Sequence, residues 1–324
     1  AQAAYDSKSF AVTSQETLPR GIAFNADGTK VYIVGLTNDT VFQYSLSTAY
    51  DISTAVYDTI SFSVASQELN PSAITFNADG TKMYIAGGSN DTVYQYTLST
   101  AFNVGTASYD SVSLLVSGQI TSPNGLFFKP DGTELYVSDG NSPNGFQYTL
   151  TTAFDLSTAS YSSKTFSWTS ESAVAVGLQL NGDGTKAYVL DIINEKVLQY
   201  SLSTAYDLST ATYSSVEFSV VSEITAAETM VFAPNGSKLY VVGTTSTIYQ
   251  YSTQGVSYTN QMDKTQLDAV TDPNHIALGN DLDLAIVFNM TSGTTVPSSD
   301  GVAINYDANI LNQGAVLGTD YNFD

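Results

Sequence analysis

The chain has 324 residues, of which 43% are hydrophobic, so it can build a large core and is not a disordered protein. Its 31 acidic and 10 basic residues give a formal net charge of −21, which disfavours nucleic acid and anionic membranes as partners. It has no cysteine, which excludes disulfides and thiolate metal sites, and no apolar stretch long enough to span a membrane. Because it lacks an initiator Met and a leader sequence, we expect a processed or trimmed form.

The first 46 residues contain four segments typical of short β-strands. Their residues alternate between the two faces of a strand and are rich in β-branched and aromatic types. These segments are Tyr5–Val12, Gly21–Phe24, Lys30–Val34 and Val41–Leu46. The Asp27-Gly28 pair between the second and third segments predicts a tight hairpin, because glycine adopts a positive φ at low steric cost.

The same four-strand unit recurs along the chain every 52 residues. The turn glycines are Gly28, Gly80, Gly132, Gly184 and Gly236. Each turn is followed by a strand that ends in Gln-Tyr, at Tyr44, Tyr96, Tyr148, Tyr200 and Tyr251, and the first four of these lead into a segment of the type LSTAYD. Four antiparallel strands in about 50 residues is the size of a propeller blade. We therefore predict an all-β fold, a five-bladed β-propeller.

The ends of the repeat region predict how the ring closes. The N-terminal segment YDSKSFAV matches the outer strands that start at Tyr57, Tyr109, Tyr161 and Tyr213, whereas the unit that ends near Tyr251 lacks such a strand. We expect the N-terminal strand to complete the last blade, which hides a sheet edge that would otherwise invite aggregation.

The repeat pattern stops at Asn260. The remaining sequence predicts a short helix and a few strands, too little for an independent core. We therefore predict two parts: residues 1–258 form the propeller, and residues 259–324 form a small β-rich segment for attachment or oligomerisation.

The loops of a propeller alternate between two faces. The Asp-Gly turns and the LSTAYD segments are nearly identical between units and lie on one face, whereas the units differ in the loops of the other face. Binding specificity usually resides in variable loops on a rigid scaffold. The candidate ligand-binding residues on the variable side are Arg20, Asn124, Asp139, Asp191 and Glu228.

Two interpretations of these residues remain open. In the first, Asp139, Asp191 and Glu228 converge in one sector and supply the oxygen ligands that Ca²⁺ prefers. In the second, each is a solvated loop residue and no metal or other cofactor is bound.

Several conspicuous side chains are interpreted as structural. We assign the repeated Tyr44 and its equivalents to packing between blades rather than to sugar stacking. Trp168 stands where the other units have Val, and we assign it to the core rather than to a stacking platform. N-glycosylation sequons occur at Asn38, Asn90, Asn235 and Asn289 and matter only in a protein secreted by a eukaryote.

Catalytic motifs are absent from the sequence. The single histidine, His275, lies outside the repeats, which excludes a Ser-His-acid relay on the ring. No HExxH, Walker A or GxSxG motif occurs, and Glu228 is the only carboxylate at the channel position. We therefore predict that the protein is not an enzyme.

The repeat motif, with Asp-Gly-Thr-Lys before a Tyr-Val or Tyr-Ile strand, resembles the YVTN-type repeats of bacterial and archaeal surface proteins and lactonase-like propellers. The resemblance implies the propeller fold. Lactonase-like members carry acidic, Asn or His residues in the channel, where this chain has Arg20, Ser72 and Val176 beside Asn124 and Glu228. The stretch from Asp272 onward resembles structural or tail-fibre proteins of marine bacteriophages, which implies a virion-attached module.

These observations lead to one hypothesis and two alternatives. The leading hypothesis is a non-enzymatic binding or structural module, extracellular or virion-associated, that recognises a cell-surface glycan or receptor. The C-terminal segment would join it to other virion or surface proteins, or to further copies of itself. The alternatives are a lactonase-like hydrolase that depends on Glu228 and a passive shell or decoration protein.

Overall fold

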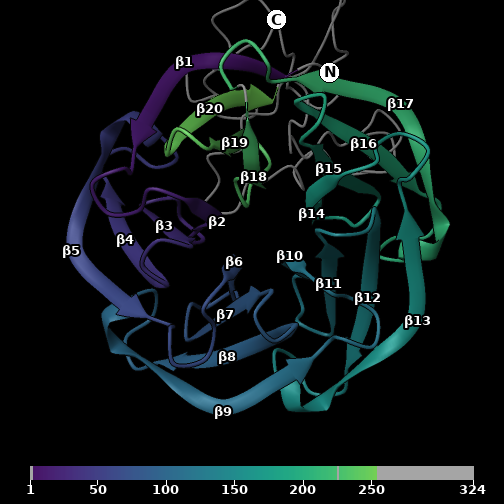
Figure 1. Ribbon diagram of the computed structural model, residues 1–324, viewed down its shortest axis with the longest axis horizontal. Helices are drawn as coiled ribbons and strands as arrows, with labels where there is room; N and C mark the ends of the chain where they lie inside the picture. The colour runs from purple at the N-terminus through teal and green to yellow at the C-terminus, as the bar shows by residue number, and fades with distance from the viewer. Residues whose placement is uncertain (1–2, 225, 254–324) are drawn as a thin grey trace, which may run out of the picture. The chain divides into compact units, whose positions relative to one another are not determined.

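The computed structural model of the chain describes residues 3–224 and 226–253. This part forms five antiparallel sheets of four strands each, arranged around a ring (Figure 1). The predicted five-bladed β-propeller is confirmed. The C-terminal segment 259–324 and the boundary at 258 lie outside the described residues and stay predictions.

Each of the first four blades runs from an innermost strand to an outer strand in chain order. Blade 1 consists of β2 (Pro19–Phe24), β3 (Lys30–Gly35), β4 (Thr40–Leu46) and β5 (Ala55–Ser63). Blade 2 consists of β6 (Pro71–Phe76), β7 (Lys82–Gly87), β8 (Thr92–Leu98) and β9 (Ala107–Leu115). Blade 3 consists of β10 (Pro123–Phe128), β11 (Glu134–Asp139), β12 (Asn144–Leu150) and β13 (Ala159–Ser167).

Blade 4 consists of β14 (Ala175–Leu180), β15 (Lys186–Asp191), β16 (Lys196–Leu202) and β17 (Ala211–Ser219). Blade 5 combines β18 (Ala227–Phe232), β19 (Lys238–Gly243) and β20 (Thr247–Thr253) with β1 (Ala3–Ala11) from the N-terminus. Figure 1 shows the purple β1 beside the green β20, and Tyr5 pairs with Tyr251. The predicted closure of the ring by the N-terminal strand is therefore confirmed.

The Asp-Gly turn has a second role besides making a hairpin. Asp27 Oδ1 accepts hydrogen bonds from the backbone N (2.9 Å) and the hydroxyl (2.6 Å) of Thr29, and Gly28 has a φ of +72°. A Cβ at Gly28 would lie 2.5 Å from the ring of Tyr50. The turn is thus also the seat for the aromatic residue of the LSTAYD segment, and Phe102, Phe154 and Tyr206 occupy the same place in the next three blades.

In four of the blades, the Gln of the Gln-Tyr pair joins the blade to its neighbour. Four short 3-10 helices follow the fourth, eighth, twelfth and sixteenth strands in the described residues: η1 (Ile52–Thr54), η2 (Val104–Thr106), η3 (Leu156–Thr158) and η4 (Leu208–Thr210). Gln43 Oε1 accepts the backbone N–H of Val104 in the next blade at 3.1 Å, and Gln95 accepts that of Leu156 at 3.0 Å. Gln147 and Gln250 make the same contact, so a buried Gln locks four of the five seams between blades.

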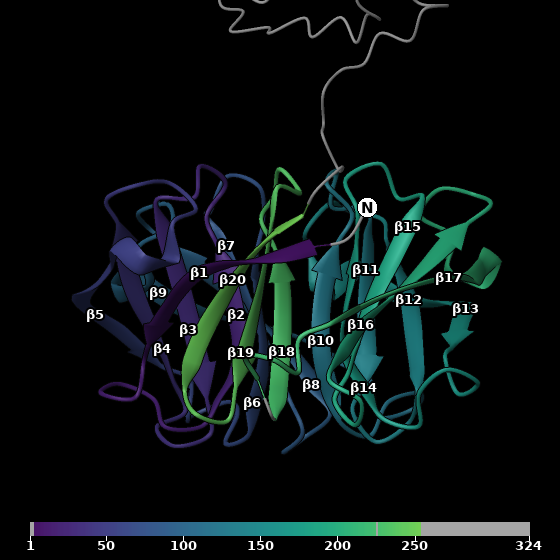
Figure 2. The same ribbon diagram turned by 90° about the horizontal axis from the view of Figure 1, so that it is seen from above.

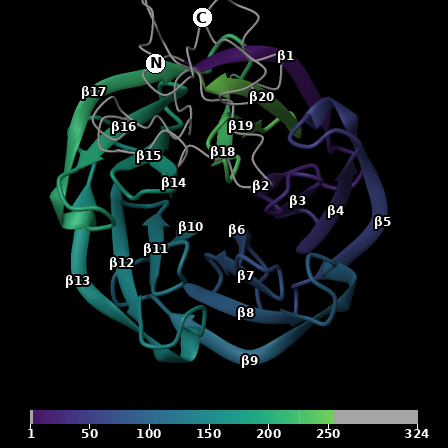
Figure 3. The same cartoon turned by 180° about the vertical axis from the view of Figure 1, so that it is seen from behind.

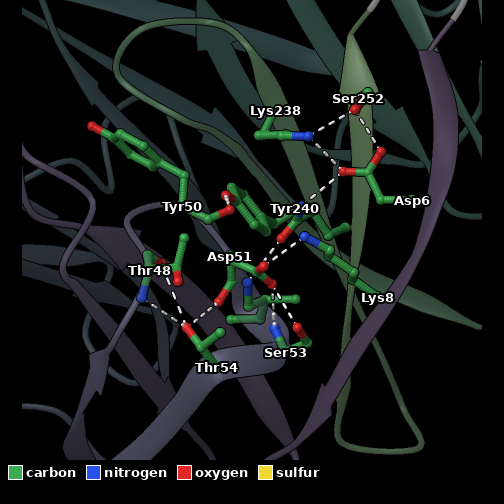
Figure 4. A network of polar contacts seen from close by, with 12 residues as sticks. Asp6, Lys8, Thr48, Tyr50, Asp51, Ser53, Thr54, Lys238, Tyr240 and Ser252 are labelled. Carbon is green, nitrogen blue, oxygen red and sulfur yellow. Dashed lines mark hydrogen bonds and ion pairs between the residues drawn. The ribbon is translucent and has the colours of Figure 1, made fainter.

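The seam between blades 5 and 1 uses the same contacts and an ion pair that recurs between blades 3 and 4 as Lys164–Asp207 (Figure 4). Gln250 accepts the N–H of Ile52 at 2.8 Å, and Tyr240 donates its hydroxyl to the carbonyl of Tyr50 at 2.7 Å. Lys8 of β1 pairs with Asp51 at 2.5 Å. The closing seam is therefore held like the seams that the chain crosses continuously.

Trp168 and the repeated tyrosines belong to the core, as predicted. Tyr44 and Trp168 are fully buried. The room for the indole comes from Gly145, which stands where the other blades have Val or Ile, since a Cβ at Gly145 would lie 3.3 Å from Trp168. Within the described residues, no helix is long and apolar enough to cross a membrane.

Candidate functional site

The two ends of the blades form two faces, which Figure 2 shows edge-on as the two rims of the ring. The repeat face carries the Asp-Gly turns and the 3-10 helices, which are joined by the hydrogen bond from Tyr50 N to Gly28 O (2.9 Å). The variable face carries the loops that lead into the innermost strands and the loops between the second and third strands of each blade. Leu36 N donates to Leu18 O at 3.1 Å between two such loops.

One residue from each innermost strand stands near the variable face. Figure 3 shows the five innermost strands surrounding the centre of the ring. The second residue of each of these strands is a different type: Arg20, Ser72, Asn124, Val176 and Glu228. We call this set the mouth residues.

Arg20 and Glu228 form an ion pair across the seam between blades 1 and 5. Arg20 is the only arginine of the chain. Burial raises the pKa of the Glu228 carboxyl and the Glu195 carboxylate raises it further, while Arg20 acts against both. The structure thus brings together two of the predicted site residues in a partly exposed ion pair. The pKa of Glu228 in this pair is raised.

Asn124 lies on the other side of the mouth with an unmet hydrogen-bonding capacity. Its Oδ1 atom is buried and has no hydrogen-bond partner. By contrast, the hydroxyl of Ser72 in the neighbouring blade has a partner, because it donates to the carbonyl of Pro123. Ser138 in β11 has a buried hydroxyl without a partner as well. Blade 3 therefore holds polar atoms that the propeller itself does not satisfy.

Asp139 and Asp191 are loop organisers. Asp139 accepts the N–H of Asn141 at 3.0 Å and the hydroxyl of Ser142 at 2.7 Å, and Asp191 accepts the N–H of Ile193 at 3.0 Å. Both side chains are buried. Their oxygens are thereby directed at their own loops, and the two residues do not converge with Glu228 on a common ligand.

Glu16 and Glu68 organise the variable-face loops of blades 1 and 2 in the same way. Glu16 Oε1 accepts the N–H groups of Leu18 (2.8 Å) and Thr37 (3.1 Å), and its side chain lies over Gly35, where a Cβ would come within 2.6 Å of it. The carboxylate therefore comes either from the incoming loop, beside a Gly, or from the end of the strand, as at Asp139. Sequence reasoning missed both glutamates, although the two positions pair Glu with Gly in blades 1 and 2 and Ile or Ser with Asp in blades 3 and 4. Blade 5 has Ile224 with Gly243 and lacks such a carboxylate.

The unsatisfied polar atoms of the described residues gather at the variable face. Six buried side-chain atoms there lack a hydrogen-bond partner: Glu16 Oε2, Asp39 Oδ1, Glu68 Oε2, Asn124 Oδ1, Ser138 Oγ and Trp168 Nε1. Burial, together with Glu16 and Glu68, raises the pKa of Asp39. Burial also raises the pKa of Glu195, which lies close to Asp191. Unpaired groups and raised carboxyl pKa values are costly to a fold and are typical of functional surfaces.

The exposed aliphatic side chains also concentrate at the variable face. Seven large hydrophobic residues of the described part are exposed, and five of them lie at the variable face: Leu18, Leu69, Leu115, Ile193 and Val221. The other two, Val56 and Val216, belong to outer strands. No aromatic side chain is exposed in residues 3–224 and 226–253.

These contacts do not support the hypothesis of a Ca²⁺ site. Within the described ranges, no group of three or more His, Asp or Glu residues could hold a metal ion. Glu228 is paired with Arg20, and the two aspartates are occupied by their own loops.

Comparisons with known proteins place the chain by fold only. No protein-family model matches it, and no curated protein does. Among solved structures it is similar to a functionally unknown protein from Desulfotomaculum acetoxidans (13% identity, TM-score 0.44, 69% of this chain and 62% of the other). It is also similar to a putative 6-phosphogluconolactonase from Bacteroides uniformis (17%, 0.44, 69% and 64%) and a periplasmic gluconolactonase from Pseudomonas aeruginosa (14%, 0.43, 69% and 63%). The chain thus spans less than two thirds of these structures' own length.

The names of these structures correct one prediction. Several solved structures similar to the chain are named as lactonases, so the prediction that the protein is not an enzyme does not stand. The resemblance to lactonase-like propellers agrees with these findings, whereas the resemblance to phage tail-fibre proteins is not matched in them. At these identities the likeness concerns the fold, and the activity in each name belongs to that protein.

Proposed function

We propose that the protein is a binding propeller that recognises a cell-surface ligand through the variable face, with the repeat face as scaffold. The observation that carries this proposal is the gathering of all six unsatisfied buried polar atoms of the described residues at one face. A buried polar atom without any partner costs a fold about 1–3 kcal/mol, so each of these six needs a partner that the propeller itself does not supply. A ligand that supplies the missing partners would recover part of that cost.

The mouth residues support the same proposal by their chemistry. They offer a guanidinium, a hydroxyl, an amide and a carboxylate at equivalent positions of four blades, with Val176 in the fifth. A structural role alone would favour one residue type repeated in every unit, as is seen for the Asp-Gly turn. Different types at equivalent positions favour recognition of an asymmetric ligand.

The test uses the full chain, labelled with a fluorophore, on an array of cell-surface glycans and on a display library of short random peptides. We expect at least one ligand, bound about tenfold more weakly after Asn124→Ala. The matched control is Lys82→Ala, which removes the repeat-face contact to Asp110 and should leave affinity unchanged. Absence of any ligand, or equal losses in the two variants, would overturn the proposal.

A second candidate function rests on Glu228. A partly exposed carboxyl with a raised pKa beside a guanidinium can serve as a general acid or base while the guanidinium holds an anionic group. A lactonase-like hydrolase would then open lactone esters at the mouth. Turnover of lactones that is lost in Glu228→Gln supports this function, and turnover that survives the substitution rules out a role of Glu228 in it.

A further inference from the structure

Exposed aliphatic side chains form an arc on the variable face across blades 4, 5, 1 and 2. Leu18 and Leu69 stand in the loops that lead into blades 1 and 2, and they are 44% and 65% exposed. Ile193, 65% exposed, lies in the loop between β15 and β16 of blade 4, and Val221, 54% exposed, leads into blade 5. These last two loops are joined by the hydrogen bond from Val220 N to Glu195 O (2.8 Å). These four side chains stand on separate loops, and none of the exposed large aliphatic residues of the described part lies in a repeat-face loop, so the loops of the variable face are the more apolar.

The same face has an excess of negative charge. Of the basic side chains in the described part of the chain, only Arg20 and Lys196 lie there, and both are ion-paired, with Glu228 and Glu217. The acidic residues of this face are Glu16, Asp39, Glu68, Asp91, Asp139, Glu171, Asp191, Glu195, Glu223 and Glu228. Most other lysines of the described residues pair with carboxylates of the repeat-face half, such as Asp51 and Asp58. The resulting field attracts cations to the variable face.

Three of the carboxylate oxygens lack any donor. Glu16 Oε2, Asp39 Oδ1 and Glu68 Oε2 are buried without a partner where blades 1 and 2 meet, and Glu16 and Glu68 are fully buried residues. The backbone places Asp39 against the incoming loop of blade 2, because Val64 N donates to Asp39 O at 2.8 Å. These orphan oxygens lie next to the exposed Leu18 and Leu69, so apolar and anionic features alternate along the arc.

We propose that the variable face binds a protein segment in which Lys or Arg side chains are interspersed with aliphatic ones. This inference rests on the proposed function and names its partner class. The aliphatic side chains of the segment cover Leu18, Leu69, Ile193 and Val221, and its cations lie beside partly exposed carboxylates of the face such as Asp39 and Glu223. A glycan fits this face less well, because no aromatic ring of the described residues is exposed for a sugar to stack on.

The test is selection of short peptides from a random display library on the full chain. We expect the enriched peptides to combine Lys or Arg with Leu, Ile or Val, and to bind more weakly as salt rises. The double variant Leu69→Ser/Ile193→Ser should weaken them about tenfold or more. The matched control is Val56→Ser, a 66% exposed residue on the outer strand β5, which should leave binding unchanged.

The outcomes separate this inference from the proposed function. Enrichment of acidic peptides, no enrichment, or equal loss in the control and the double variant would overturn the inference. If the glycan array yields a ligand that Asn124→Ala weakens while the peptide library yields none, the binding propeller stands and the partner is a glycan. If neither yields a ligand, both proposals fail.

Discussion

The two faces of this ring are built from one repeat, yet their carboxylates behave in opposite ways. In the repeat-face half, hydrogen bonds from neighbouring hydroxyls, amides and lysines outweigh burial and lower the pKa values of Asp6, Asp27, Asp51, Asp58, Asp79, Asp131, Asp183 and Asp207. On the variable face the pKa values of Asp39, Glu195 and Glu228 are raised, mainly by burial. On the repeat face, folding pairs these carboxylates with hydrogen-bond donors. The variable face keeps polar groups that folding does not satisfy.

The largest expected difference between the faces concerns two glycines. Gly80→Ala puts a methyl group 2.3 Å from the ring of Phe102 at a φ of +71°, so we expect a loss of about 3 kcal/mol in the free energy of unfolding. Gly118→Ala, in a variable-face loop with nothing within 4 Å of the new atom, should change it by less than about 0.5 kcal/mol. Urea unfolding measures both, and similar losses would contradict the role of Gly80 as the residue that makes room for the ring of Phe102.

The next effect tests how blade 3 departs from the repeat. Trp168→Val leaves a cavity, because Gly145 has no side chain to fill the space, and should cost about 2 kcal/mol. Adding Gly145→Val restores the pair of residues found in the other blades and should recover about 1 kcal/mol. A double variant less stable than Trp168→Val alone would mean that the two positions do not compensate each other.

The smallest effect is a pair of opposite pH dependences. The pKa of Asp58 is lowered in the folded protein, so its ionised form stabilises the fold above the ordinary value of 3.8, and this contribution is lost as the pH falls through the lowered pKa. Asp58→Asn should therefore lower stability by about 1 kcal/mol at neutral pH and much less in acid.

Asp39 should respond in the opposite direction. Its raised pKa means that ionisation destabilises the fold above that pKa, and the penalty disappears as the pH falls toward 3.8. Asp39→Asn should therefore raise the urea midpoint at neutral pH, with a gain that shrinks on acidification. A loss of stability at neutral pH would show that the Asp39 carboxylate is satisfied.

The sequence predicted those parts of the fold that every unit repeats. The spacing of Gly28 and its equivalents, and the missing outer strand after Tyr251, were sufficient for the blade count and the closure. The bonds between blades were not predictable, because the sequence shows that Gln43 recurs but not that its partner is the backbone of Val104.

The candidate site was predicted less well than the fold. Arg20 and Glu228 meet as neighbours in the ring, whereas for Asp139 the divergence between units favours ligand binding when only the sequence is considered. The structure shows that Asp139 replaces the function of Glu16 from a different position. Divergence between units identifies where a repeat varies, whereas the direction of a side chain depends on loop geometry that the sequence does not show.

The most direct test of the account is the double variant Arg20→Val/Glu228→Val, measured for both stability and binding. Val176 occupies the equivalent position in blade 4, and replacing an ion pair by apolar residues is often neutral or stabilising. We expect a free energy of unfolding within about 1 kcal/mol of the parent or above it. We also expect at least about a tenfold loss of affinity for the strongest ligand from the glycan array or the peptide library. Unchanged affinity with a destabilised fold would contradict it.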